Sequence, residues 1–236
     1  MNDYMIWNLL YLLVFLAVIF SLWASFKVNS TFRKFSQERP RSGMTGYDAA
    51  RQVLDANGLQ SVRIERIAGE LTDHFDPRDN VIRLSDSVYG VASTAAIGVA
   101  AHEAGHAIQY AQEYAPLKVR NAIVPITNIG SRLAIPLVLL GILFSGMGSI
   151  WIQVAYVGVA CFALCVVFQL VTLPTEFNAS RRAMAAIETR GMLTQQELNS
   201  SRQVLTAAAM TYVAALAVSI TQLLRLLWMV QRNDRR

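Results

Sequence analysis

The sequence predicts a mainly α-helical, polytopic membrane fold, with about four transmembrane helices and one small α+β region at the membrane surface. Three observations carry this prediction. The 236 residues are 54% hydrophobic and only 16% charged, which is too apolar for an ordinary soluble domain. The hydrophobic residues form long uncharged runs. Between the first two runs lies a more polar stretch, in which the apolar residues first have the spacing of a helix, then alternate as in strands, and then return to helical spacing.

The first uncharged run is Met5–Phe26, whose 22 residues exceed the roughly 20 that a bilayer crossing needs. A removable signal peptide would begin with basic residues, whereas this run follows Asp3 and no lysine or arginine. We therefore interpret residues 5–26 as transmembrane helix 1, an anchor that stays in the protein.

The second run, Leu133–Thr175, holds 43 uncharged residues, enough for two crossings, and small residues at 145–149 favour a tight turn between them. The last run, Gln203–Leu224, is 22 residues long. The predicted organisation is transmembrane helix 1 (5–26), a region with a β-hairpin and a motif helix (27–120), transmembrane helices 2 and 3 (121–175), a surface segment (176–203) and a transmembrane or packed helix 4 (204–230).

Residues 27–46 are polar and basic, so we expect a linker there. Thr45 and Asp48 form a capping-box pattern, which predicts a helix that Gly58 ends. Thr194 and Glu197 form a second capping-box pattern later in the chain. Val62–Ile67 alternates like a half-buried strand. The runs 70–75 and 80–85 flank a turn-rich quartet, Asp-Pro-Arg-Asp, and predict a β-hairpin.

The next helix is predicted from the N-cap Ser93 to about Tyr114, with Pro116 as its stop. It contains His102-Glu103-Ala104-Gly105-His106, a His-Glu-x-x-His motif. Histidines four residues apart on a helix lie on one face, about 5–6 Å apart, and can share one cation. Ala104 and Gly105 are small enough to let another segment approach closely. Burying two imidazoles and a carboxylate without partners is costly, so a purely structural pair is the weaker interpretation.

A zinc site with an open position takes three protein ligands. His74 is the one remaining histidine, and the two cysteines, Cys161 and Cys165, lie deep in an apolar run, so the third ligand is His74 or a carboxylate. Glu176 is the best placed, because two crossings return the chain to the side of the motif. Glu103, next to the histidine face, has the position of a general base.

Four blocks of the sequence resemble the YugP-type neutral zinc metallopeptidases of bacterial membranes and, more distantly, the HtpX-type membrane gluzincins. They are Leu71–Pro77, Ala100–Ala107, Tyr114–Arg120 and Glu176–Ala183. The resemblance covers nearly the whole chain. It implies a small α+β zincin-like catalytic region at the membrane surface, one Zn²⁺ per chain, His102, His106 and Glu176 as ligands, and Glu103 as base.

The chain departs from the gluzincin pattern at Ser180, where that pattern has an aspartate four residues after the ligand glutamate. The residue that would orient a zinc-bound histidine is therefore not identified by the pattern, and Ser180, Asn178 and Asp73 are the candidates. His74 and Arg181 are further candidates for contacts with substrate or with the oxyanion, as are Arg182 and Tyr212 by composition.

These observations predict a zinc metalloendopeptidase acting on peptides or proteins, unfolded or membrane proteins among them. An intramembrane-cleaving metalloprotease is one alternative, but no predicted span contains the aspartate that would complete its site. A non-catalytic membrane protein with a structural metal site is the other, and it leaves Glu103 idle.

The net charge of +5 does not indicate nucleic-acid binding, because the basic residues cluster at the ends of apolar runs. The positive-inside rule instead places the motif side in the cytoplasm of a bacterial cell, in the inner membrane. The opposite side would carry Arg232, Arg235 and Arg236 if helix 4 crosses. The basic residues that flank spans on the motif side are Lys27, Arg33, Lys34, Arg39, Arg41, Lys118, Arg120, Arg132, Arg181, Arg182, Arg190 and Arg202.

Overall fold

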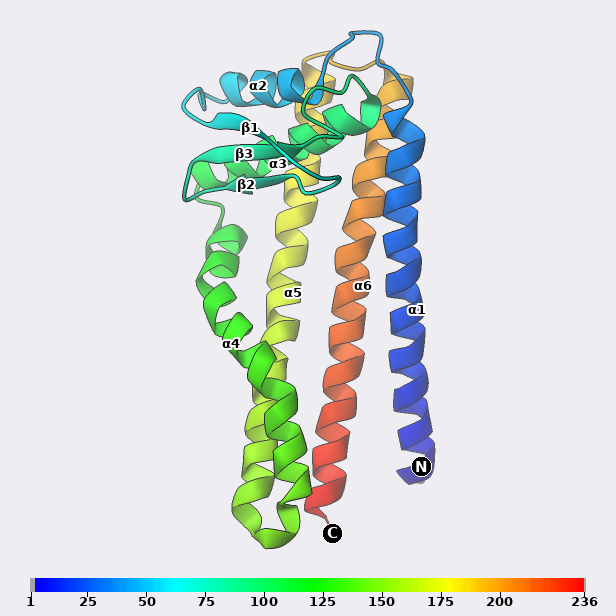
Figure 1. The fold of residues 1–236 in the computed structure, drawn as a ribbon, viewed down its shortest axis with the longest axis vertical. Helices are drawn as coiled ribbons and strands as arrows, with labels where there is room; N and C mark the ends of the chain where they lie inside the picture. Colours follow the sequence, from blue (N-terminus) through cyan, green and yellow to red (C-terminus); the bar gives the residue numbers. More distant parts are fainter. Residues whose placement is uncertain (1–2, 236) are drawn as a thin grey trace. The chain divides into compact units, whose positions relative to one another are not determined.

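The computed structural model describes residues 3–235 and is mainly helical, as predicted (Figure 1). Its elements, in chain order, are α1 (Asp3–Ser36), α2 (Gly46–Ala56), β1 (Arg63–Ile67), β2 (His74–Asp76), β3 (Val81–Ser85), α3 (Thr94–Ala111), α4 (Ala115–Leu143), the 3₁₀ turn η1 (Ser145–Met147), α5 (Ser149–Thr189) and α6 (Gln195–Asp234). Within this range, α1, α4, α5 and α6 are long and apolar enough to cross a membrane. The prediction of a polytopic membrane fold is confirmed.

The chain divides into two compact units. Unit 1 contains residues 1–23, 119–173 and 212–236, and unit 2 contains residues 24–118 and 174–211. Each long helix therefore has one part in each unit.

In unit 1, α4 and α5 pack closely through small residues. A Cβ on Gly158 would lie 2.7 Å from the carbonyl oxygen of Ala134, and one on Gly141 would lie 2.6 Å from the Cβ of Ala155. Small residues at such contacts let helix backbones approach where lipid supplies no hydrophobic driving force between helices. The predicted break at residues 145–149 is the 3₁₀ turn η1.

Unit 2 is built around α3. Its apolar core joins α3 to α2, to β3 and to the last turns of α1, where Phe32 and Phe35 are buried. The parts of α5 and α6 that follow residue 174 add Ala183, Ile187 and Leu198 to the same core. The motif helix is thus surrounded by protein within its own unit.

The small sheet has the order β1-β3-β2. The predicted hairpin is present, with β2 and β3 antiparallel, and β1 pairs in parallel with the other side of β3. The central β3 is the most buried strand, and β2 is an edge strand that contacts α3. On the face away from α3, Arg83 pairs with Asp76 and Asp79 at 2.8 and 2.5 Å, and this contact lowers the pKa of Asp76.

Several boundaries differ from prediction. The expected linker at 27–46 is helical through Ser36, because the charged residues Lys27, Arg33 and Lys34 lie on a solvated continuation of α1. Strand β2 is short, since the backbone turns at Leu71, whose φ is +54°. Helix α5 runs on through Thr189, so the predicted surface segment 176–203 begins inside a helix.

The motif helix ends at Ala111, before Pro116, which lies in the first turn of α4 instead of stopping α3. Proline is tolerated there because the first N–H groups of a helix have no intrahelical partner. The predicted caps at Thr45, Ser93 and Thr194 are all present.

Candidate metal centre

Three potential metal ligands converge in unit 2, two from α3 and one from α5. The Nε2 atoms of His102 and His106 lie 3.1 Å apart. The Oε2 atom of Glu176 lies 3.3 Å from the Nε2 of His102 and 3.4 Å from that of His106. These residues form a group that could hold a metal ion.

The size of this triangle fits zinc. Zn²⁺ binds imidazole nitrogen and carboxylate oxygen at about 2.0–2.1 Å, and tetrahedral angles then separate the donor atoms by about 3.3 Å. The three observed separations of 3.1, 3.3 and 3.4 Å match this value. Two histidines and one glutamate leave the fourth position open, as in catalytic zinc sites.

The close packing of α3 on α5 brings the ligands together. A Cβ on Gly105 would lie 2.7 Å from the backbone oxygen of Ala179, so only glycine permits this approach. Glu176 lies one turn before Ala179 on α5, so this approach brings it close to both histidines, although it follows His106 by 70 residues in the chain. Its side chain is only 3% exposed. The expectation that a small residue in the motif admits another segment is therefore confirmed, and that segment carries the carboxylate.

Glu103 is buried beside the cluster, at 8% exposure. Burial alone would lower the pKa of His106, but the hydrogen bond with Glu176 and the charges of Glu103 and Glu176 outweigh it, so the pKa of His106 is raised. Glu103 therefore lies near enough to His106 for its charge to favour the protonated imidazole.

Asp73 lies near Glu103 and has a structural role in the sheet. Its carboxylate accepts hydrogen bonds from the backbone N–H of Ser85 at 2.7 Å and from the Ser85 hydroxyl at 2.9 Å. Burial raises the pKa of Asp73 despite these bonds, and the charge of Glu103 acts in the same direction. Asp73 thus anchors the start of β2 to β3 through Ser85.

Of the three candidates for the partner of a histidine, Ser180 is the one that contacts His102 in the structure. The Ser180 hydroxyl lies 3.1 Å from the Nδ1 of His102. Serine therefore stands where the gluzincin pattern has an aspartate, and its hydroxyl contacts a histidine of the cluster.

Gln109 was not identified from the sequence. Its Oε1 lies 3.0 Å from the Nδ1 of His106. Its Nε2 donates to the carbonyl of Thr175 at 2.8 Å and to Asn178 at 2.9 Å. Its spacing could have identified it from the sequence, because Gln109 follows His106 by three residues and side chains at i and i+3 meet on a helix.

Three other candidates, His74, Arg181 and Arg182, are not members of the cluster. His74 opposes Arg83 in the β2–β3 register and shares its face, whereas Phe75 points the other way, onto Tyr110 of α3. His74 is therefore exposed on the outer face of the sheet, with its Nδ1 2.9 Å from the carbonyl of Thr72. Arg181 is exposed on α5, while Arg182 donates to Asn178 and Gln112.

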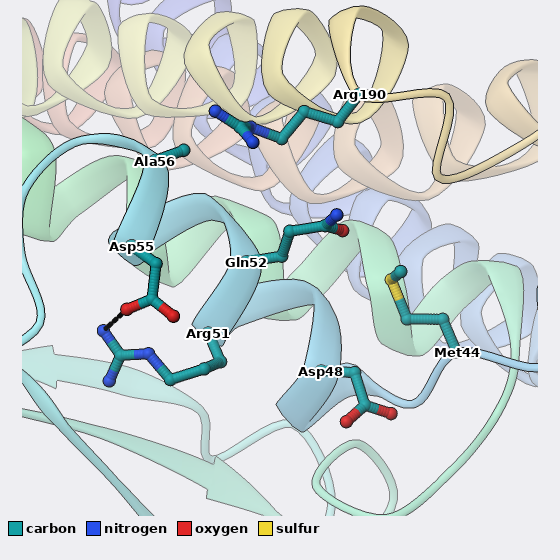
Figure 2. A pocket seen from close by; sticks show the side chains of 7 residues that line it. All are labelled: Met44, Asp48, Arg51, Gln52, Asp55, Ala56 and Arg190. Carbon is teal, nitrogen blue, oxygen red and sulfur yellow. Dashed lines mark ion pairs between the residues drawn. The ribbon is translucent and has the colours of Figure 1, made fainter.

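A surface hollow along α2 contains none of these residues (Figure 2). Its lining includes Arg51 and Asp55, which form an ion pair at 2.8 Å, and Arg190 at the end of α5. The hollow therefore shares no residue with the cluster of His102, His106 and Glu176.

The fold and the cluster define a membrane protein with a potential His₂Glu metal centre and a glutamate beside it, the class to which membrane-bound metal hydrolases belong. Residues 10–231 match the family described as "Putative neutral zinc metallopeptidase", and the chain belongs to this family. It is similar to "Putative membrane protease YugP" of Bacillus subtilis (strain 168), with 46% identity over 205 residues, 87% of this chain and 89% of that protein. No solved structure matches the chain. The predicted family is thereby confirmed.

Proposed function

We propose that this protein is a membrane-embedded zinc-dependent endopeptidase that holds one zinc ion per chain, with His102, His106 and Glu176 as ligands and Glu103 as general base. The observation that carries the proposal is the triangle of donor atoms with separations of 3.1–3.4 Å, which has the dimensions of a tetrahedral zinc site. The family match supports zinc as the metal.

Zinc, when bound, would polarise the peptide carbonyl and make a water molecule acidic enough to lose a proton near neutral pH. Glu103 would take that proton and later deliver it to the leaving amine. Its burial suits this role, because a general base works best when its carboxylate is held in one position. His102, His106 and Glu176 would remain fixed throughout.

The substrate would bind as an extended peptide along β2, whose outer edge is unpaired within the sheet. Phe75 of this strand packs on Tyr110, one turn after His106, so a peptide on this edge would lie alongside the motif helix. Main-chain hydrogen bonds to an edge strand do not depend on sequence, which favours unfolded segments of proteins, membrane proteins among them, as substrates.

The protein would reside in the bacterial inner membrane with its catalytic side in the cytoplasm. With the spans as predicted from the sequence, twelve lysine and arginine residues flank them on the motif side, against three at the C-terminus. The motif helix α3 is not among the four candidate spans, which supports cleavage at the membrane surface over cleavage within the bilayer.

The Glu103→Gln variant tests the mechanism. Glutamine keeps the size of the side chain but cannot accept the proton, so we expect zinc content to remain at one per chain and cleavage of casein to fall by at least about 100-fold. Glu113→Gln is the control, because Glu113 is an exposed glutamate just after the same helix and pairs with Lys118. Undiminished cleavage by the purified Glu103→Gln protein would exclude the proposed role of Glu103.

Metal removal separates the two alternatives from the main proposal. A chelator should abolish casein cleavage, and added zinc should restore it, if the protein is a surface-acting zinc peptidase. A structural metal site would give bound zinc without cleavage. An intramembrane protease would cleave a membrane-spanning substrate but not casein.

A further inference from the structure

Gln109 is a fully buried polar side chain whose hydrogen-bonding groups are all used. It has 0% exposure on α3 and forms three hydrogen bonds, one through its oxygen and two through its nitrogen. Burying an amide in an Ala-rich helix face costs free energy unless every group has a partner. The side chain is thus held in one conformation by contacts with both α3 and α5.

These contacts determine which way the Gln109 amide points. The carbonyl oxygen of Thr175 only accepts hydrogen bonds, so the amide nitrogen must face it. The contact with Asn178 requires the same orientation. Arg182 donates to the Oδ1 of Asn178 at 2.7 Å, so this atom is an acceptor, and the amide nitrogen of Gln109 must face it as well. The amide oxygen of Gln109 therefore faces His106.

The orientation of the amide in turn sets the tautomer of His106. An amide oxygen can only accept, so the Nδ1 of His106 must carry the proton that it donates across 3.0 Å. In the neutral imidazole the other nitrogen, Nε2, then has a free lone pair. This Nε2 is the atom that faces His102 and Glu176 at 3.1 and 3.4 Å.

His102 has no equally strict partner. Its Nδ1 faces the Ser180 hydroxyl at 3.1 Å, and a hydroxyl can donate or accept. The contact therefore permits either tautomer of His102. Of the two histidines, only His106 has its metal-binding form imposed by hydrogen bonds.

Gln109 also ties together the two helices that supply the ligands. Thr175, whose carbonyl receives its hydrogen bond, directly precedes Glu176 in the chain. Arg182, which donates to Asn178, also donates to Gln112 at the end of α3. One polar network therefore connects His106 on α3 with the backbone beside Glu176 on α5.

We propose that Gln109 is a positioning residue that imposes the metal-binding tautomer of His106 and fixes α3 to α5 next to Glu176. This inference rests on the proposed zinc site and adds to it a fourth residue that decides metal affinity without touching the metal. Partners of zinc-bound histidines commonly change metal affinity 10–100-fold when they are replaced.

Two substitutions of Gln109 distinguish positioning from packing. Gln109→Glu keeps an oxygen that accepts from the Nδ1 of His106 but loses the N–H donors to Thr175 and Asn178, so it isolates the effect of the tautomer from that of the link between the helices. Gln109→Leu keeps the volume and removes every hydrogen bond. If Gln109 positions His106, Gln109→Leu should weaken zinc binding about 10–100-fold, and Gln109→Glu should stay within about tenfold of the wild type. If Gln109 serves only packing, leucine should be the better tolerated residue at this fully buried position.

Zinc affinity should be measured on the full-length protein in detergent, by competition with a chromophoric chelator. The visible spectrum of the Co²⁺-substituted protein reports the coordination geometry independently of activity. The control is Gln112→Leu, which removes only the contact with Arg182 at the outer end of the network. It should leave zinc affinity and the Co²⁺ spectrum unchanged.

Zinc affinity and Co²⁺ spectra equal to wild type in Gln109→Leu would overturn the inference, as would tighter zinc binding by Gln109→Leu than by Gln109→Glu. Failure of the proposed function gives a different result. In that case the wild-type protein binds no zinc, or binds zinc without cleaving casein.

Discussion

Glu176 is a buried carboxylate, 3% exposed, and it follows 43 uncharged residues. Such a group is stable in this position only with partners that carry or can bind positive charge. His102 and His106 are two such partners, with their Nε2 atoms 3.3 and 3.4 Å from the Oε2 of Glu176. A metal ion coordinated by all three side chains would neutralise the carboxylate fully.

Replacing Glu176 by alanine should remove the third ligand. We expect the Glu176→Ala protein to lose zinc at low free metal and to lose proteolysis with it, while the apolar helices stay folded. Zinc content by plasma emission and helix content by circular dichroism would measure both effects on detergent-purified protein. The matched control is Glu188→Ala, an exposed glutamate on the same helix. A Glu176→Ala protein that retained one zinc per chain and cleaved normally would move the third ligand elsewhere.

Ser180 offers a gain-of-function test at the same scale. Its hydroxyl lies 3.1 Å from the Nδ1 of His102, and a carboxylate there would accept the Nδ1 proton without ambiguity. Ser180→Asp should therefore bind zinc at least as tightly as the wild type, and Ser180→Ala should bind it about tenfold more weakly. Chelator competition measures both variants. Weaker binding by Ser180→Asp than by Ser180→Ala would contradict the orienting role.

At the scale of elements, the contact between α3 and α5 sets the geometry of the cluster. Gly105 and Ala179 meet backbone to backbone, with 2.7 Å between the position of an added Cβ and the Ala179 oxygen. Two closely packed helices leave no space for an added methyl group, so the extra volume either moves them apart or strains their backbones.

A methyl group at Gly105 should therefore damage both stability and metal binding. We expect Gly105→Ala to lower the free energy of unfolding by about 1–3 kcal/mol and the melting temperature by several degrees. Zinc binding should weaken as well, because Glu176 would move away from the histidines together with α5. Gly90→Ala is the control, since an added Cβ there meets no atom within 4 Å. Thermal unfolding in detergent, with and without zinc, is the measurement. A Gly105→Ala protein with wild-type stability and zinc affinity would show that the helices can shift without cost.

At the scale of the whole molecule, the orientation in the membrane can be tested with single cysteines. The native Cys161 and Cys165 would first be replaced by alanine. A cysteine at Ser42 should then resist an impermeant thiol reagent in intact cells, because the motif side is expected in the cytoplasm. A cysteine at Met147, 75% exposed in the turn between α4 and α5, should react. The reverse labelling pattern would reverse the proposed orientation.

The sequence by itself determined the features that depend on neighbouring residues. Uncharged runs predicted the membrane helices, because length and hydropathy alone decide whether a helix can cross a bilayer. Side chains at Thr45, Ser93 and Thr194 predicted three helix starts, because each cap bonds to a backbone group within three residues. The spacing of His102 and His106 placed both on one helix face for the same reason.

Only the tertiary structure decided which distant groups meet. Nothing local in the sequence pairs β1 with β3, turns His74 away from α3, or brings Gln109 to Thr175, 66 residues later in the chain. Likewise, Ser180 could be assigned to His102 only after α3 and α5 were seen to pack at Gly105. Contacts of this kind depend on helix packing and on the pairing of buried polar groups, both of which are properties of the folded chain as a whole.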